Sequence, residues 1–175
     1  MEERSATAID SRTVHAGRVF TIVSDRVRLP NGRETTLDVV RHRPSVILVP
    51  MPDPAHVVLV RQYRYCIDRW IWELPAGTLE PHEDVETAAR RECREETGRD
   101  PGRIERVGAC YPTPGYCDEL MVFFRLTELK TLTTPAARDE DEVLEPRVFT
   151  LEAARQLARA ADVADMKTVV GLSLV

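Results

Sequence analysis

The sequence predicts an α/β fold of the α+β kind, a layered sandwich of strands and helices with a separate small sheet at its N-terminal end. Two observations predict it. One helical segment, Glu83–Thr97, has strand-forming segments on both sides along the chain, which is typical of layered mixed folds. The first two strand segments flank the turn sequence Pro30-Asn31-Gly32. They therefore predict a hairpin that forms its own sheet.

The elements follow in chain order from hydrophobic periodicity and turn residues. Gly98 fits the C-cap of the Glu83–Thr97 helix. The division expected is a hairpin region, residues 1–43, and a main domain, residues 44–175. The predicted strands are Val19–Leu29, Thr35–His42, Ser45–Met51, His56–Tyr63, Trp70–Leu74, Ile104–Tyr111, Leu120–Leu126 and Arg147–Thr150. The two further predicted helices are Leu151–Ala161 and Met166–Leu174.

Composition indicates a cytoplasmic protein with no nucleic-acid or membrane partner. The net charge of -5 disfavours non-specific nucleic-acid binding, which depends on basic patches. No apolar segment is long enough for a signal peptide or a transmembrane span. The four cysteines form no C-x-x-C pair, so reduced thiols in a cytosolic protein are expected.

The helix at Glu83–Thr97 carries acidic residues on the side expected to face the core. Glu92 and Glu96 share the apolar side on a helical wheel, and Glu95 lies at its edge. Clustered carboxylates at a core edge repel one another and are costly to desolvate, and Mg²⁺ or Mn²⁺ resolves both problems. The apolar side comprises Val85, Ala88, Ala89 and Cys93. The opposite side comprises Thr87, Arg90, Arg91, Arg94 and Thr97.

The segment GTLEPHEDVETAARRECREETGR, residues 77–99, resembles the Nudix box, G-x5-E-x7-R-E-U-x-E-E-x-G-U, where U is apolar. Arg99 departs from the final apolar position, and we expect this to change local packing and not activity. The resemblance implies a Nudix-type α/β/α sandwich with a mixed sheet. It also implies metal-dependent hydrolysis of a nucleoside diphosphate linked to another group. The residues in register are Gly77, Glu83, Arg91, Glu92, Glu95, Glu96 and Gly98.

The same resemblance assigns roles around the helix. Glu92 and Glu96 are implied as the chief ligands of Mg²⁺, or of Mn²⁺. Glu95 is implied to assist them, and the backbone carbonyl of Ala76 to be a further ligand. Arg91 is implied to hold a glutamate in place, so its role, like those of Gly77, Glu83 and Gly98, is structural. Glu95 and Glu96 are also expected to take part in catalysis.

Two flanking segments resemble the ADP-ribose pyrophosphatase branch: WIWELPAG, residues 70–77, and LDVVRHRPSVILVP, residues 37–50. Pro114 lies sixteen positions after Gly98, where that branch has a proline. The implied reaction converts ADP-ribose to AMP and ribose 5-phosphate. The implied assembly is a homodimer formed through the N-terminal sheet. Another nucleoside diphosphate sugar, such as GDP-mannose or ADP-glucose, is an alternative substrate. A non-catalytic sensor module is a further alternative, opposed by the presence of every box glutamate.

The branch also implies residues outside the box. Glu140 is implied as the general base and Glu142 as a metal ligand, with the two roles exchangeable. The competing interpretation of this acidic loop is a solvated charge run. Arg64 matches an arginine that contacts the diphosphate, although a surface arginine competes with that interpretation. Weaker matches place Arg41 at a phosphate or the partner subunit, and Glu119 at the terminal ribose.

Overall fold

The computed structural model describes residues 5–134, 144–159 and 165–175, and the chain divides into two compact units. The smaller unit comprises Met1–Pro44 and Tyr111–Leu120. The larger unit comprises Ser45–Cys110 and Met121–Val175. The loop of residues 111–120 thus packs with the N-terminal strands, although strands of the larger unit precede and follow it in the sequence.

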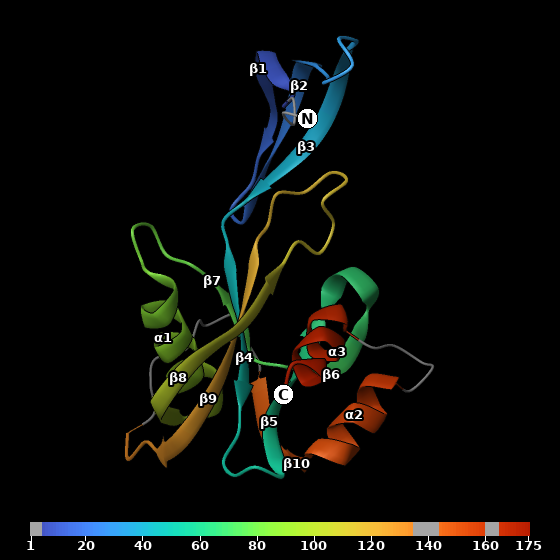
Figure 1. The fold of residues 1–175 in the computed structure, drawn as a ribbon. Coiled ribbons are helices and arrows are strands. Elements are labelled where there is room, and N and C mark those ends of the chain that lie inside the picture. The colour runs from blue at the N-terminus through green and yellow to red at the C-terminus, as the bar shows by residue number, and fades with distance from the viewer. Residues whose placement is uncertain (1–4, 135–143, 160–164) are drawn as a thin grey trace. The chain divides into compact units, whose positions relative to one another are not determined.

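The smaller unit is an antiparallel sheet in the order β1-β2-β3 (Figure 1). The hairpin predicted around Pro30-Asn31-Gly32 is confirmed, and Gly32 supplies the positive φ of its turn, +84°. The first strand was missed because all ten of its residues are exposed, so no burial pattern marks it in the sequence. The strands are β1 (Thr7–Ala16), β2 (Phe20–Arg28) and β3 (Glu34–His42).

The larger unit contains two sheets. One has the order β7-β4-β9-β8 and is mixed, since β4 and β9 run parallel while its other pairs are antiparallel. The second has the order β10-β5-β6 and is antiparallel. The mixed sheet comprises β4 (Ser45–Pro50), β7 (Ala76–Thr78), β8 (Arg99–Cys110) and β9 (Met121–Thr131). The second sheet comprises β5 (His56–Arg64), β6 (Arg69–Glu73) and β10 (Leu144–Thr150).

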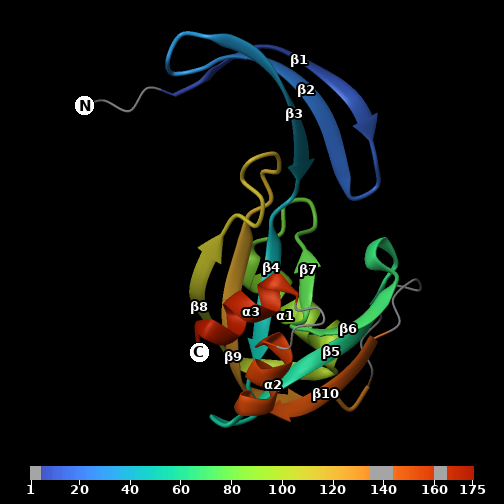
Figure 2. The same ribbon diagram turned by 90° about the vertical axis from the view of Figure 1, so that its right-hand side faces the viewer.

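Helices cover both sides of this unit, which confirms the predicted α/β/α sandwich. Figure 2 shows α3 in front of β4 and α1 behind it. The helix α2 packs on β5 and β10. The core between the layers is aliphatic and aromatic, and includes Ile47, Leu59, Leu74, Phe123 and Leu172. The helices are α1 (Val85–Thr97), α2 (Leu151–Arg159) and α3 (Met166–Ser173), and a short 3-10 helix, η1, covers Tyr65–Ile67.

Several predicted boundaries differ from the structure. The helix α1 begins at Val85 because Asp84 is its N-cap, accepting hydrogen bonds from the backbone N–H groups of Glu86 and Thr87 at 3.0 Å. Its predicted C-cap is confirmed, since Gly98 has φ +67° and donates its N–H to the Arg94 carbonyl at 3.1 Å. The strands β8 and β10 begin earlier than predicted, and β7 is not among the predicted strands. Both β8 and β10 lie at sheet edges, where exposed polar residues hide the strand pattern.

Both tryptophans of the chain lie on β6. The Trp70 ring lies 5.7 Å from that of Tyr63, and the Trp72 ring meets that of Phe149 edge-on at 4.9 Å. These contacts join β6 to β5 and β10 through their side chains, alongside the backbone ladder. No helix within the described ranges is long and apolar enough to cross a membrane.

Candidate metal and diphosphate site

The carboxylates of α1 lie on its buried side. Glu92 is 8% exposed and Glu96 is 5% exposed. They share that side with the buried apolar residues of the helix, which confirms the predicted orientation. The prediction was wrong for Thr97, which is buried and not on the solvent side. Its hydroxyl donates to the Cys93 carbonyl at 2.5 Å, so the polar group is satisfied within the helix.

Arg91 connects three of the box glutamates. Its Nε and Nη2 atoms donate to the two carboxylate oxygens of Glu83, each at 2.9 Å. Its Nη1 donates to Glu92 at 2.7 Å and to Glu95 at 3.0 Å. The hydrogen bond from Arg91 holds the pKa of Glu83 below its usual value, and the pKa of Arg91 is raised in return. The guanidinium therefore fixes these carboxylates and offsets their mutual repulsion.

Gly77 allows the backbone of β7 to lie directly against the Glu92 carboxylate. A Cβ atom at this position would stand 1.8 Å from Glu92 Oε1 and 1.9 Å from its Cδ. The strand is held there by its pairing with β4, in which Ala76 lies opposite Ile47. The main chain at Ala76 and Gly77 therefore borders the acidic side of α1. Only glycine leaves room for the carboxylate at this contact.

The chemistry of this donor set fits a hard divalent cation. Two buried carboxylates, Glu92 and Glu96, lie one helical turn apart, and the peptide groups of β7 adjoin the first of them. Oxygen ligands of this kind are those that Mg²⁺ and Mn²⁺ prefer. Within residues 5–134, 144–159 and 165–175, no three Asp, Glu, His or Cys side chains converge as a ready-made metal site. The predicted base Glu140 and ligand Glu142 lie outside the described residues.

Arg64 reaches the site from the end of β5. Its Nε and Nη2 donate to the two oxygens of Glu73 at 2.7 and 2.9 Å, while its side chain remains 42% exposed. Burial alone would lower the pKa of Arg64, but the hydrogen bond to Glu73 and the nearby negative charges raise it. One of those charges belongs to Glu96, so the Arg64 guanidinium lies within electrostatic range of the acidic side of α1.

Sequence reasoning missed the partners of Arg64. Glu73 is completely buried, and Lys167 of α3 contacts the same carboxylate. Asp165 is the N-cap of α3 and lies 3.1 Å from Lys167 Nζ. The sequence does contain a sign that Glu73 has a charged partner, since it is a charged residue between the apolar residues Trp72 and Leu74. Such a residue needs a partner when its strand is buried.

The other predicted substrate residues belong to the smaller unit. Arg41 donates to Asp25 at 2.6 Å and to Asp118 at 3.0 Å, so it ties the loop of residues 111–120 to β2 and β3. Pro114 is exposed in a turn of that loop. Glu119 lies 3.9 Å from His42 Nδ1. The structure therefore groups Arg41, Pro114 and Glu119 in one unit, and Arg64 with the box glutamates in the other.

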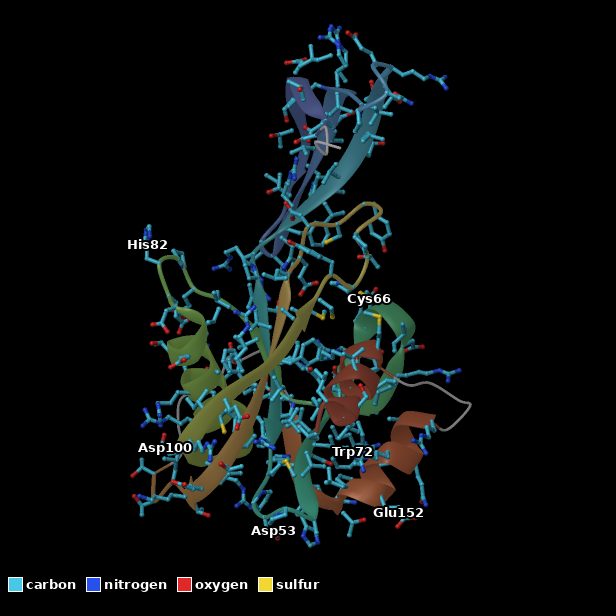
Figure 3. The ribbon with its side chains drawn as sticks, viewed as in Figure 1. Asp53, Cys66, Trp72, His82, Asp100 and Glu152 are labelled. Carbon is cyan, nitrogen blue, oxygen red and sulfur yellow. The ribbon has the colours of Figure 1, made fainter. Side chains whose placement is uncertain are left out.

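Two further features lie apart from the carboxylates. His82 is exposed at the tip of the loop that precedes α1 and points away from the helix (Figure 3). A hollow elsewhere in the larger unit is lined in part by Arg103, Glu105 and Arg125. There both arginines pair with Glu105, at 3.3 and 2.7 Å. None of the described residues that line the hollow is a predicted site residue.

Known proteins are similar to this chain over most of its length. The family model described as NUDIX domain matches residues 41–170. An ADP-ribose pyrophosphatase of Bacillus subtilis (strain 168) is 34% identical over 96% of this chain and 91% of its own length. A GDP-mannose pyrophosphatase of Salmonella arizonae is 32% identical over 88% of this chain and 93% of its own.

A crystal structure of an ADP compounds hydrolase superposes on this chain with a TM-score of 0.83. The superposition covers 99% of this chain and 94% of the hydrolase chain at 24% sequence identity, so it supports the assignment of the fold. The family match spans most of the chain and includes α1 with all its box glutamates. The chain therefore belongs to the NUDIX family, and it is a Nudix pyrophosphohydrolase.

Proposed function

We propose that this enzyme hydrolyses the pyrophosphate bond of ADP-ribose, giving AMP and ribose 5-phosphate, with Mg²⁺ as its metal. The main support is the buried acidic side of α1, fixed by Arg91 and bordered by the backbone at Gly77. The choice of ADP-ribose is supported by the relative from Bacillus subtilis, which matches nearly the whole chain. It is also supported by the WIWELPAG segment and the position of Pro114.

The proposed roles follow from the contacts. Glu92, Glu96 and the Ala76 carbonyl would hold a divalent cation that offsets the charge of the diphosphate. Arg91 keeps Glu92 and Glu95 in place. Arg64 is half-exposed and would bind a phosphate oxygen with the N–H groups that face away from Glu73.

The remaining proposed roles belong to residues of the smaller unit and to two glutamates outside the described residues. Glu140 is proposed to take a proton from the attacking water, with Glu142 as a further ligand or with the two roles exchanged. Pro114, Arg41 and Glu119 are proposed to contact substrate. Arg41 already joins two carboxylates, so any phosphate contact would have to share its guanidinium with Asp25 and Asp118.

A substrate panel with a matched pair of variants tests the proposal. We expect faster hydrolysis of ADP-ribose than of GDP-mannose, ADP-glucose or a nucleoside triphosphate. Mass spectrometry of products formed in H₂¹⁸O would show which phosphorus is attacked. Glu96→Gln should lower kcat by more than about 100-fold, since even outer-shell partners of metal ligands contribute roughly 10–100-fold. Glu86→Gln, on the exposed side of the same helix, is the control. Preference for the triphosphate, or full activity in Glu96→Gln, would contradict the proposal.

GDP-mannose is the second candidate substrate. The relative from Salmonella arizonae is nearly as similar as the ADP-ribose relative, at 32% against 34% identity. The groups proposed to bind the diphosphate or the metal would serve either nucleotide. Competition assays that contain both substrates would separate them, because the ratio of kcat/KM values measures the preference directly.

We further propose that the enzyme is a cytoplasmic homodimer joined through the smaller unit. Its sheet exposes Ile9, Val14, Phe20 and Leu37, which a second copy would cover. The four cysteines are free thiols, as the reducing cytoplasm would keep them. Light scattering after gel filtration should give the mass of a dimer. The Val14→Asp variant should give a lower mass, closer to that of the monomer. A monomeric wild type would refute the dimer.

A further inference from the structure

Four charged side chains of the larger unit form a cluster, and one of them, Arg64, is the residue proposed to bind the diphosphate. Its centre is Glu73, at the end of β6, which is completely buried. Arg64 from β5 binds both carboxylate oxygens, and Lys167 from the first turn of α3 contacts Oε2. Asp165, the N-cap of α3, lies 3.1 Å from the same ammonium group. Three elements of the larger unit therefore meet at one carboxylate.

Two cations contact the buried carboxylate of Glu73. Arg64 alone would satisfy Glu73, since it already provides a bidentate pair. The second cation, Lys167, is nearly buried and draws on the same oxygen that Arg64 Nη2 uses. Glu73 is therefore held from two sides, by Arg64 and by Lys167, which fixes the position of its carboxylate. The fixed carboxylate in turn holds the Arg64 guanidinium in one orientation, with its remaining N–H groups on the exposed side.

Further contacts make α3 a rigid support for this arrangement. The Leu74 N–H donates to the Thr168 hydroxyl at 2.8 Å, and that hydroxyl donates to Asp165 at 2.6 Å. Gly171 allows close packing as well, because a Cβ there would lie 2.3 Å from Leu74 Cδ1. The helix is thus fixed to the segment that runs into β7. Lys167 cannot move without disturbing these contacts.

We propose that Lys167 is a positioning residue that, through Glu73, holds the Arg64 guanidinium in the orientation that binds the substrate diphosphate. The proposal rests on the proposed function, in which Arg64 binds that diphosphate. Stability alone is a weak reason for such a cluster. A buried ion pair often contributes no more to stability than apolar residues of the same volume.

Kinetics of two Lys167 variants test the proposal. Lys167→Met should raise KM for ADP-ribose about tenfold and leave kcat within about threefold, the pattern of a lost binding interaction. Lys167→Arg keeps a cation beside Glu73 and should restore KM to within about threefold of the wild type. Lys130→Met, on the exposed part of β9, is the matched control. A purely structural role would lower the melting temperature of Lys167→Met and leave KM unchanged, which would overturn the proposal.

A double-mutant cycle shows whether Lys167 acts through Arg64. In an Arg64→Met background, Lys167→Met should add less than about a twofold change in KM. Independent effects that multiply would refute the positioning role. If Lys167→Met does not fold, Glu73→Gln/Lys167→Met removes the completely buried anion together with its cation, so that no buried carboxylate at position 73 is left without Lys167. That variant should still show the raised KM, and a wild-type KM in it would also refute the proposal.

ADP binding separates this proposal from the proposed function. If the wild type hydrolyses none of the nucleoside diphosphate sugars, the proposed function fails. Calorimetric titration with ADP and Mg²⁺ then still compares the wild type with Lys167→Met. Binding about tenfold weaker in the variant supports the positioning role. Equal affinity overturns it, whatever the substrate is.

Discussion

Gly77→Ala is expected to inactivate the enzyme while leaving it folded. The new methyl carbon would stand 1.8 Å from Glu92 Oε1, whereas ordinary contact begins at 3.4 Å, so the carboxylate must withdraw by about 1.6 Å. The obstructing atoms belong to the end of a flexible side chain, so Glu92 can turn away and β7 can stay paired with β4. Turning away also breaks the 2.7 Å hydrogen bond from Arg91.

The magnitude follows from that displacement. A misplacement of about 1 Å in a catalytic group can lower the rate roughly 100-fold, which corresponds to about 2.7 kcal/mol of activation free energy. We therefore expect kcat/KM to fall at least about 100-fold. Loss of one hydrogen bond costs about 1 kcal/mol of stability, which lowers the melting temperature by roughly 2–4 °C.

The assay pairs initial rates with a thermal melt and a Mg²⁺ titration of activity. Gly108→Ala is the control, because its methyl carbon would lie 3.1 Å from the movable end of Leu174. It should retain wild-type rates. If Gly77→Ala kept near-normal kcat/KM, the contact between β7 and Glu92 would not matter for catalysis. If the variant unfolded, the added methyl group would have displaced the strand β7 and not the Glu92 side chain, contrary to the prediction.

Three further predictions concern α1 and its flanks. Arg91 holds the pKa of Glu83 below its usual value. The pair therefore stabilises the fold fully above the unfolded pKa of about 4.3, and this stabilisation is lost as the pH falls through the lower folded pKa. Urea denaturation should therefore show Glu83→Gln less stable than the wild type at pH 7, with the difference shrinking below about pH 4; a constant difference would contradict this. Burial raises the pKa of Cys93 to about 11, so iodoacetamide at pH 8 should leave it unmodified in native protein while the exposed Cys66 reacts, as read by mass spectrometry. Asp84→Ala removes the N-cap and should cost about 1 kcal/mol in denaturant melts with little change in KM; an unaffected melt would show that the cap is dispensable.

The parts of the fold that bury apolar surface could be predicted from the sequence. The continuous apolar run of β4 and the wheel of α1 both reflect burial that the structure confirms. The strand β1 buries nothing, and β7 has three residues, so neither leaves a periodic pattern. Thr97 was misplaced because a threonine that bonds its own helix needs no solvent.

The candidate site likewise has a part that the sequence predicts and a part that it does not. The box fixes residue types at set spacings within one helix, so Glu92 and Glu96 could be placed from the sequence. The cluster around Glu73 joins β5, β6 and α3, and its contacting residues Glu73 and Lys167 are 94 positions apart along the chain. No local pattern connects Glu73 with Lys167. Only the packing of α3 on the end of β6 brings the two together.

The location of both tryptophans on β6 determines what an optical experiment can detect. Intrinsic fluorescence will report on the strand that ends at Glu73, and a quenching signal on nucleotide addition would arise next to the Arg64 cluster. The smaller unit contains no tryptophan, so its separate melting would leave that signal unchanged. Circular dichroism would register the loss of its three strands. A mismatch between the two melting curves would therefore identify an intermediate in which the catalytic sandwich outlasts the N-terminal sheet.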